Sequence, residues 1–178
     1  MEKDISEILF TETMIGERVT RLGMQITRDY AGKAPLLLGV LKGCFVFMAD
    51  LMRRVGLRCE VRFIAASSYG SGTVSSGGVR FGELSQLDIE GRDVVVVEDI
   101  VDSGLTLKRL RDILTEMRPA SLRVCALLDK KSRREVEVEI DYIGFECGDV
   151  FCVGYGLDCA ERYRNLPYIG VLKPEIYI

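Results

Sequence analysis

The sequence predicts an α/β fold with a mostly parallel, doubly wound sheet. Short apolar runs alternate with segments of helical periodicity, which favours parallel strands joined by crossover helices. The runs at 35–41 and 94–97 are almost wholly apolar, as in strands that are buried on both faces. The chain has 178 residues, a length that favours one domain whose core needs no disulfide or metal.

The first half of the chain contains two predicted helices. The first is indicated by apolar residues at helical spacing, with Thr13 as its N-cap and Gly32 at its end. The second helix follows the strand at 35–41, and its apolar residues are Phe45, Met48, Met52 and Val55. Alternating side chains predict a strand at 59–65. Residues 67–80 are rich in Gly and Ser and are predicted to form a mobile loop.

The second half continues the alternation. The strand at 94–97 is followed by a helix that ends before Pro119, and then by a strand at 122–128. The apolar residues of this helix are Leu107, Leu110, Leu114 and Met117. From residue 140 onward the sequence is richer in Gly and aromatic residues, which indicates short strands and loops.

Composition argues against several classes of function. The formal net charge is −3, which does not favour a nucleic-acid or membrane surface as the main function. No stretch approaches the roughly 18 uninterrupted apolar residues of a membrane span, and no signal peptide is visible, so we expect a cytoplasmic protein. The chain has no histidine, and its 6 cysteines form no C-x-x-C pair, so we expect neither zinc nor histidine-based catalysis.

The most informative segment follows the strand at 94–97. Three acidic side chains, Glu98, Asp99 and Asp102, crowd a strand-to-helix turn at the edge where open α/β sheets bind ligands. The residues that open the next helix are Ser103, Gly104, Leu105 and Thr106. Free N–H groups at a helix N-terminus favour phosphate, whereas carboxylates suit ribose hydroxyls or a hydrated cation. The segment therefore predicts a sugar-phosphate site.

A simpler interpretation is that Asp102 and Ser103 only cap the helix. Capping accounts for one acidic residue, but it gives no reason for Glu98 and Asp99 at the end of an apolar strand. We therefore favour the sugar-phosphate site.

Residues 94–107 read Val-Val-Val-Val-Glu-Asp-Ile-Val-Asp-Ser-Gly-Leu-Thr-Leu, which resembles the phosphoribosyl pyrophosphate motif of type I phosphoribosyltransferases. Other segments resemble the hypoxanthine-guanine branch of that family, in the same order along the chain. They are a pyrophosphate loop at 41–44, the start of a lid at 68–70, a lysine segment at 127–130, and hood and terminal segments at 151–158 and 162–167. The resemblance implies the type I fold, with a core at about 10–140, a small C-terminal hood mainly from 141–178 and a lid at 67–80.

The resemblance implies a role for each residue of the base site. Asp102 would act as general acid and base beside N7 of the purine. Lys130 would donate to the exocyclic O6, which favours a 6-oxopurine over adenine. Phe151 would stack on the ring, with Cys152 and Asp158 also at the base site. The implied reaction moves the 5-phosphoribosyl group from phosphoribosyl pyrophosphate to hypoxanthine or guanine, which gives IMP or GMP and pyrophosphate in purine salvage.

The resemblance also implies a magnesium ion, held by Glu98, Asp99 and Asp158. Glu98, Asp99 and the segment 102–106 would bind the ribose and its 5′-phosphate. Because family members form homodimers or homotetramers, we expect one of these assemblies here.

A pyrophosphate site and a lid complete the implied machinery. Lys42 and Gly43 would contact pyrophosphate mainly through backbone amides, next to a non-proline cis peptide that family members often carry. Arg164 would grip the pyrophosphate oxygens with its planar fork. Ser68 and Tyr69 would close over the site and exclude water.

Three cysteines depart from the family pattern. Cys44 stands where Gly, Ala or Ser is more usual, so we expect this thiol near the active site and open to oxidation. Cys152 and Cys159 stand where apolar and tyrosine residues are commoner. Because Cys152 would flank the base pocket, the sequence leaves the preference among hypoxanthine, guanine and xanthine open.

Three alternatives compete with this interpretation. A transferase for adenine or a pyrimidine is disfavoured by Lys130 and Phe151, although these residues argue less firmly against xanthine. A regulator that kept the fold and binds nucleic acid is disfavoured by the net charge of −3 and by the intact carboxylates. A receiver-like signalling domain would leave the segment 103–106 and the lid segment without an explanation.

Overall fold

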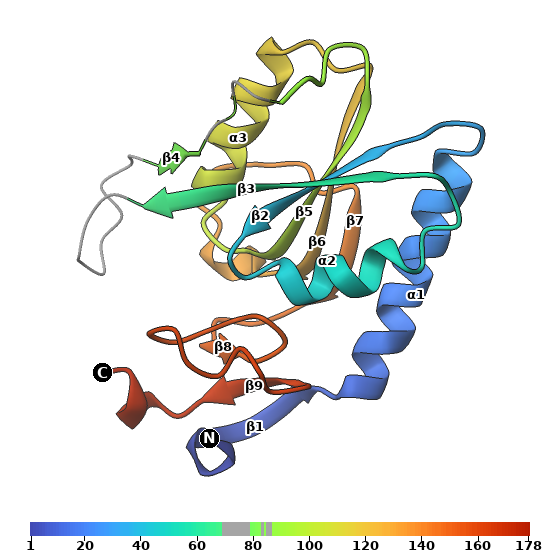
Figure 1. Cartoon of the computed structure of the whole chain (residues 1–178). Helices are drawn as coiled ribbons and strands as arrows, with labels where there is room; N and C mark the ends of the chain where they lie inside the picture. Colours follow the sequence, from blue (N-terminus) through green and yellow to red (C-terminus); the bar gives the residue numbers. More distant parts are fainter. Residues whose placement is uncertain (69–78, 83, 85–86) are drawn as a thin grey trace.

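Among the described residues, the main sheet has six strands in the order β4-β3-β2-β5-β6-β7 (Figure 1). The computed structural model describes residues 1–68, 79–82, 84 and 87–178, with only the backbone of 67–68 and 79–80. The strands are β2 (Leu36–Leu41), β3 (Glu60–Ser68), β4 (Val79–Phe81), β5 (Asp93–Val101), β6 (Ser121–Asp129) and β7 (Tyr142–Glu146). All pair in parallel except β4, which runs antiparallel to β3 at one edge.

The strand order reverses between β2 and β5. After β2 the chain adds β3 on one side, and it then returns to place β5 on the other side of β2. The strands β6 and β7 continue outward from β5. The carboxyl ends of β2 and β5 therefore meet at the switch point of the sheet, which is where open α/β folds bind ligands.

Helices cover both faces of the sheet, as the doubly wound prediction requires (Figure 1). The helices α1 (Glu12–Asp29) and α2 (Phe45–Met52) pack on one face, and α3 (Leu105–Glu116) packs on the other. Within β5, Val95 and Val97 pack toward α1 and α2, whereas Val94 and Val96 pack toward α3. This explains why the run at 94–97 is apolar without alternation.

Two helix details differ from the sequence prediction. The N-cap of α1 is Thr11 rather than Thr13, and its hydroxyl accepts a hydrogen bond from the Met14 N–H at 3.3 Å. In α2 the buried residues are Phe47, Met48 and Leu51, while Phe45 and Met52 are exposed. The helix is shorter than predicted, because it ends at Met52 and leaves Val55 in the following turn. Of the four residues in the predicted stripe, only Met48 and Val55 are therefore buried.

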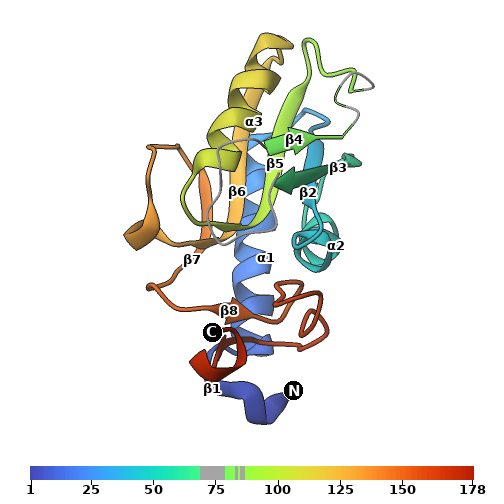
Figure 2. The same cartoon turned by 90° about the vertical axis from the view of Figure 1, so that its left-hand side faces the viewer.

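A second, antiparallel sheet lies beyond the carboxyl edge of the main sheet, and both chain termini lie beside it (Figures 1 and 2). Its order is β1 (Ile5–Phe10), β9 (Ile169–Leu172) and β8 (Cys152–Val153). The sequence did not predict β1, which joins this sheet from the opposite end of the chain. The predicted boundary of the hood at 141 also differs, because β7 belongs to the main sheet.

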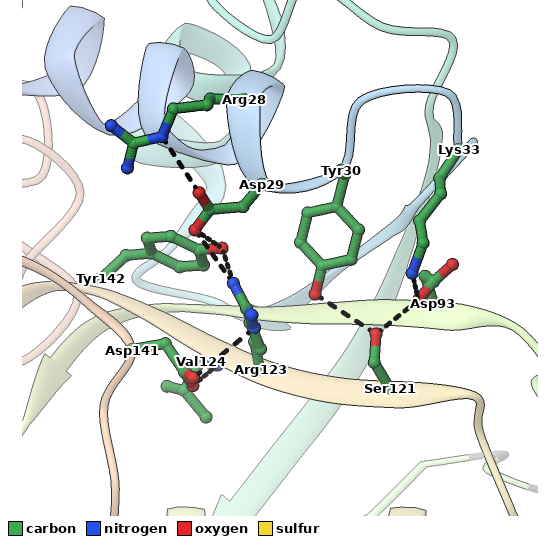
Figure 3. Close-up of polar contacts among 10 residues, drawn as sticks. All are labelled: Arg28, Asp29, Tyr30, Lys33, Asp93, Ser121, Arg123, Val124, Asp141 and Tyr142. Atoms are coloured by element: carbon green, nitrogen blue, oxygen red, sulfur yellow. Dashed lines mark hydrogen bonds and ion pairs between the residues drawn. The ribbon is translucent and has the colours of Figure 1, made fainter.

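A polar network holds the amino ends of β5, β6 and β7, opposite the switch point (Figure 3). Arg123 donates to Asp29 at 3.0 Å and to the Tyr142 hydroxyl at 2.7 Å, which ties the end of α1 to the sheet. Ser121 donates to Asp93 at 2.6 Å. Because its carboxylates already have partners, this network stabilises the fold rather than forming a ligand site. No helix among the described residues is long and apolar enough to cross a membrane.

Candidate active site

A cavity of about 220 Å³ opens at the switch point between β2 and β5. Its walls come from the carboxyl ends of the two strands, the turn after β5 and the first turn of α3. The cavity brings together most of the predicted sugar-phosphate and pyrophosphate residues: Lys42, Gly43, Glu98, Asp99, Asp102, Ser103, Gly104 and Thr106. Leu105, also predicted, is the first residue of α3.

The loop after β2 lies directly against Asp99. A Cβ atom added to Gly43 would come within 1.6 Å of the Asp99 Oδ2 atom, so only glycine fits at position 43. The peptide bond between Leu41 and Lys42 is cis, as the family resemblance implies. The backbone of the loop thus reaches the carboxylates of β5 with no side chain between them.

The two carboxylates at the end of β5 differ in environment. Burial raises the pKa of Glu98 well above its ordinary value, and the neighbouring negative charge of Asp99 raises it further. Burial also raises the pKa of Asp99 to about 6, although backbone N–H groups and the charge of Arg164 oppose that shift. Both carboxyl groups therefore hold a proton more strongly than exposed acidic side chains do.

The turn before α3 presents backbone N–H groups to the cavity. Gly104 is the N-cap of α3 and has a φ of 84°, a left-handed conformation that suits glycine. A Cβ atom there would also come within 2.9 Å of Arg134 and of the Val136 carbonyl. The N–H groups of the first turn of α3 have no carbonyl of their own helix to bond, so they can receive an anion.

Asp102 and Lys130 form the predicted base-binding pair. Lys130 is buried, and its Nζ atom lies 3.9 Å from Asp102 Oδ2, too far for a hydrogen bond. Arg133 Nε lies 3.7 Å from Asp102 Oδ1. Among the described residues, this Oδ1 atom is buried and has no hydrogen-bond partner. Asp102 thus has an unfilled bonding position next to a buried lysine.

Phe151 and Cys152 lie at the edge of the hood. The Phe151 ring stacks on Tyr177, with 4.5 Å between ring centroids, so one of its two faces is already covered. Cys152 is buried, and its thiol shares a hydrogen bond with Cys147 that raises the pKa of Cys152. The charges of Lys130 and Asp102 also act on both thiols, which is consistent with the expectation that Cys152 flanks the base site.

Arg164 and Lys42 are both engaged by acidic side chains. Arg164 donates to the Gly156 carbonyl at 2.7 Å and lies 2.9 Å from Asp158. Lys42 Nζ donates to Glu161 at 3.1 Å, and the other oxygen of Glu161 lies 3.4 Å from Arg164. Glu161 therefore bridges the two cations that were predicted to bind pyrophosphate. The sequence analysis assigned no role to Glu161.

The predicted metal ligands do not form a ready-made cage. In the described part of the chain, no group of three or more His, Cys, Asp or Glu side chains is placed to hold a metal ion. Burial raises the pKa of Glu98 and so disfavours its charged form, the form that binds a cation. Asp158 lies close enough to Asp99 to influence the pKa of that carboxyl. These two carboxylates are compatible with an ion held mainly by water and substrate, as magnesium often is.

Cys44 lies near the site, as expected, but its side chain is fully buried. Burial, together with the charges of Asp99 and Glu98, raises the pKa of its thiol. The expectation that it is open to oxidation is therefore wrong, because the reactive thiolate is disfavoured.

Tyr69 lies outside the described residues, and only the backbone of Ser68 is described. Their lid role stays a prediction.

The sequence analysis also missed Asp129 and Arg134. The two side chains form an ion pair, and Arg134 donates to the carbonyl groups of Val101 and Asp102 at 3.3 and 3.1 Å. No periodicity marks this pair, since the turn between β6 and the next segment brings it together. The only signal was the position of both residues beside Lys130.

Comparisons with known proteins agree with this geometry. The phosphoribosyl transferase domain family matches residues 7–160. The hypoxanthine-guanine phosphoribosyltransferase of Bacillus subtilis is 48% identical over 177 residues, which cover 99% of this chain and 98% of that protein. The bifunctional TilS/HprT protein of Listeria monocytogenes is 51% identical over 177 residues, but the chain spans only 27% of its length.

Solved structures are similar over nearly the whole chain. A hypoxanthine phosphoribosyltransferase from Staphylococcus aureus has a TM-score of 0.95 and 44% identity, and the match covers 100% of this chain and 97% of that one. A hypoxanthine-guanine phosphoribosyltransferase from Bacillus anthracis has a TM-score of 0.89 and 46% identity, with 95% of this chain and 99% of that one covered. The fold, with its parallel sheet and small hood, is therefore the one that the sequence predicted.

Proposed function

Because the chain belongs to the phosphoribosyltransferase family, in its hypoxanthine-guanine branch, we propose that it is a purine salvage enzyme. It transfers the 5-phosphoribosyl group from phosphoribosyl pyrophosphate to hypoxanthine or guanine and releases IMP or GMP with pyrophosphate. The observation that carries this proposal is the position of Asp102. This residue lies both in the turn that opens α3 and 3.9 Å from the buried Lys130, so one turn joins an anion site to a base site.

The base site follows from the chemistry of Lys130 and Asp102. A buried ammonium group needs an acceptor, and the exocyclic O6 of a 6-oxopurine supplies one, whereas the 6-amino group of adenine does not. The unpartnered Asp102 Oδ1 atom can accept the proton that N7 loses when N9 attacks the sugar or return it in the reverse reaction. The face of Phe151 that Tyr177 does not cover can stack on the purine.

The sugar phosphate binds along the turn between β5 and α3. The N–H groups of residues 103–106 hold the 5′-phosphate, and the Asp99 carboxylate accepts hydrogen bonds from ribose hydroxyls. Glu98 also lines the cavity, and in its protonated form it could donate as well as accept hydrogen bonds there. The sugar C1 atom then lies between the base site and the loop after β2.

Departure of pyrophosphate requires cations near the loop after β2. Lys42, which lines the cavity, and Arg164, whose charge acts on Asp99 from outside the lining, would supply them. The Glu161 carboxylate lies within ion-pair distance of both cations. Pyrophosphate would therefore compete with Glu161 for these two side chains.

We further propose that magnesium is required. Asp99 and Asp158 would hold the ion through water and the substrate's own oxygens, which suits an ion that keeps several waters. When bound, magnesium neutralises the charge that develops on the leaving pyrophosphate. Asp99 and Asp158 are also placed to orient the ribose and Arg164, whether or not the ion is present.

The proposal is tested by an absorbance assay with phosphoribosyl pyrophosphate, magnesium and one base at a time. Turnover of hypoxanthine or guanine, lost when a chelator is added and restored by magnesium, is the expected result. Adenine should not react. The relative rates with hypoxanthine, guanine and xanthine give the base preference, which the presence of Cys152 at the base site leaves open. Absence of turnover with all four bases would refute the proposed activity.

We also propose a cytoplasmic homodimer or homotetramer whose substrates are small molecules. The exposed side chains of Phe45 and Met52 on α2, with Phe63 on the neighbouring β3, give an apolar area suited to a second copy of the chain. Light scattering coupled to size-exclusion chromatography would give the mass in solution. A monomer at micromolar concentration would refute this assembly.

A further inference from the structure

We propose that Arg134, anchored by Asp129, is a positioning residue that shapes the phosphate loop, defined here as residues 101–104. This inference rests on the proposed function, because it takes this loop as part of the binding site for the 5′-phosphate of the substrate. The guanidinium of Arg134 bonds backbone carbonyls of this loop, so it acts through the loop rather than on the ligand.

The guanidinium of Arg134 bonds three groups at once. Its Nε atom donates to the Asp102 carbonyl at 3.1 Å, and its Nη2 atom donates to the Val101 carbonyl at 3.3 Å. The same Nη2 atom pairs with Asp129 Oδ1. The planar fork of arginine can hold two carbonyls and a carboxylate in fixed directions, which the single ammonium group of lysine cannot do.

This ion pair is buried beneath the loop. The side chain of Asp129 is 3% exposed and that of Arg134 is 16% exposed. A buried ion pair has little net effect on stability, because loss of hydration offsets the attraction between the charges. Its geometric effect is larger, since the pair fixes where the guanidinium points. The pair is therefore better explained by the position of the loop than by stability alone.

Backbone N–H groups of the segment 130–135 also bond the loop carbonyls. The Lys130 N–H donates to the Val101 carbonyl at 3.0 Å, and the Glu135 N–H donates to the Ser103 carbonyl at 2.9 Å. Every carbonyl from Val101 to Ser103 is thus held by the segment 130–135. Carbonyl oxygens would repel a phosphate, so holding them away from the cavity leaves the N–H groups to face it.

The Gly104 conformation fits the same arrangement. A Cβ atom at Gly104 would meet the Arg134 side chain at 2.9 Å, so the arginine packs directly under the N-terminus of α3. Arg134 also fixes the backbone of Asp102, whose side chain faces Lys130. One arginine outside the cavity therefore sets both the phosphate loop and the carboxylate that we assign to proton transfer.

The inference predicts a selective loss of affinity. The 5′-phosphate is shared by phosphoribosyl pyrophosphate and IMP, whereas inorganic pyrophosphate binds on the side of Lys42 and Arg164. Replacing Arg134 by Met keeps the length of the side chain but removes its donors. We expect Arg134→Met to weaken IMP binding by about 10- to 100-fold, because charged hydrogen bonds that fix the loop are lost. Pyrophosphate binding should change by less than about twofold.

The test is isothermal titration calorimetry of IMP and of magnesium pyrophosphate with each protein. Arg111→Met is the matched control, because Arg111 also donates to a backbone carbonyl, that of Glu139 at 2.8 Å, but lies far along α3. The control should bind both ligands like the wild type. Arg134→Lys keeps the positive charge beside Asp129 and should show an intermediate loss of IMP affinity. If the Met variant does not fold, this Lys variant is used for the test instead.

The outcomes separate the possible failures. If a folded Arg134 variant binds IMP as the wild type does, or loses both ligands equally, the positioning role is refuted. If the wild-type protein binds neither ligand, the proposed function itself fails. Selective loss of IMP affinity in an Arg134 variant that is folded at the temperature of the titration supports the role, even if its melting temperature falls because Asp129 has lost its partner.

Discussion

The carboxylate of Asp99 occupies the space that any side chain at Gly43 would need. A Cβ atom on Gly43 would lie 1.6 Å from Asp99 Oδ2, although the two residues belong to different strand ends. The contact joins the loop after β2 to the end of β5 across the switch point of the sheet. It therefore fixes how closely the loop after β2, which we propose for pyrophosphate, lies to the end of β5, which we propose for ribose.

Gly43→Ala should lower turnover by about 100-fold, because the methyl group must displace either the loop or the Asp99 carboxylate by more than an ångström. Gly16→Ala is the control, since a Cβ atom there meets nothing within 4 Å and lies in the middle of α1. The control should keep full activity and gain up to about 1 kcal/mol of stability from helix propensity. Steady-state kinetics and thermal melts measure both effects. Normal turnover of Gly43→Ala would show that the contact has no functional role.

Asp99→Asn should make the protein more stable at pH 8 but not at pH 4. The pKa of Asp99 is about 6 in the folded state, raised by burial from an ordinary value of 3.8. Between these values the folded state binds more protons than the unfolded chain, so stability falls as the pH rises toward 6. The loss is about 3 kcal/mol by proton linkage, and asparagine avoids it. Urea unfolding at the two pH values measures the difference, and equal stabilities at pH 8 would contradict the raised pKa.

Asp102→Asn should lower turnover by roughly a hundredfold or more while leaving sugar-phosphate binding largely intact. An amide cannot exchange a proton with N7, but it keeps the size of the carboxyl group. Asp112→Asn serves as the control, because Asp112 pairs with Lys108 on the surface of α3. Kinetics with hypoxanthine and titration with phosphoribosyl pyrophosphate give the two quantities. Unchanged turnover would remove the role in proton transfer.

Lys130→Ala should weaken discrimination between hypoxanthine and adenine more than it weakens phosphoribosyl pyrophosphate binding. In the function that we propose, the buried ammonium group is the donor to O6, so its loss would remove the main basis for rejecting a 6-amino base. Lys131→Ala is the control, since the neighbouring Lys131 is exposed and pairs with Glu146. The ratio of kcat/KM values for the two bases is measured. Equal losses for the base and the sugar phosphate would indicate a structural role.

Glu161→Gln should lower the KM for phosphoribosyl pyrophosphate by about two- to fivefold, because ion pairs on the surface contribute little energy. Glutamine no longer neutralises Lys42 and Arg164, so these cations are more available to pyrophosphate. Glu146→Gln removes a comparable exposed ion pair away from the site and should change nothing. The effect should shrink as salt is added. An unchanged or higher KM would show that Glu161 does not compete with substrate.

Local patterns in the sequence predicted the parts of the fold that depend on neighbours along the chain. The apolar run at 94–97 and the helical spacing after Leu107 predicted β5 and α3, because burial on both faces and periodicity are local signals. The acidic cluster Glu98, Asp99 and Asp102 predicted the site because it lies beside a helix start. The family motifs assigned Lys130 to the base site, a role that stays a prediction, and the structure buries this lysine with its Nζ atom 3.9 Å from Asp102 Oδ2.

Contacts between distant segments could not be predicted in this way. The pairing of β1 with β9 joins the two ends of the chain, and the bridge from Lys42 to Glu161 joins two loops. Arg134 is one of two successive arginines in a polar turn, and nothing in its neighbours distinguishes it from a solvated side chain. Its partners lie at the ends of β5 and β6, so they come together only when these two strands pair. Cys44 was misjudged because tertiary packing buries its side chain and brings it near the charges of Asp99 and Glu98, which are remote in sequence.

The most direct test of the account is a crystal structure of the protein with IMP bound. The account predicts the 5′-phosphate at the N–H groups of residues 103–106 and O6 within hydrogen-bond distance of Lys130 Nζ. It also places N7 beside Asp102 and the purine on the face of Phe151 that Tyr177 leaves open. A nucleotide whose phosphate lies on Arg164, or whose base lies away from Lys130, would contradict the assignment of the two halves of the site.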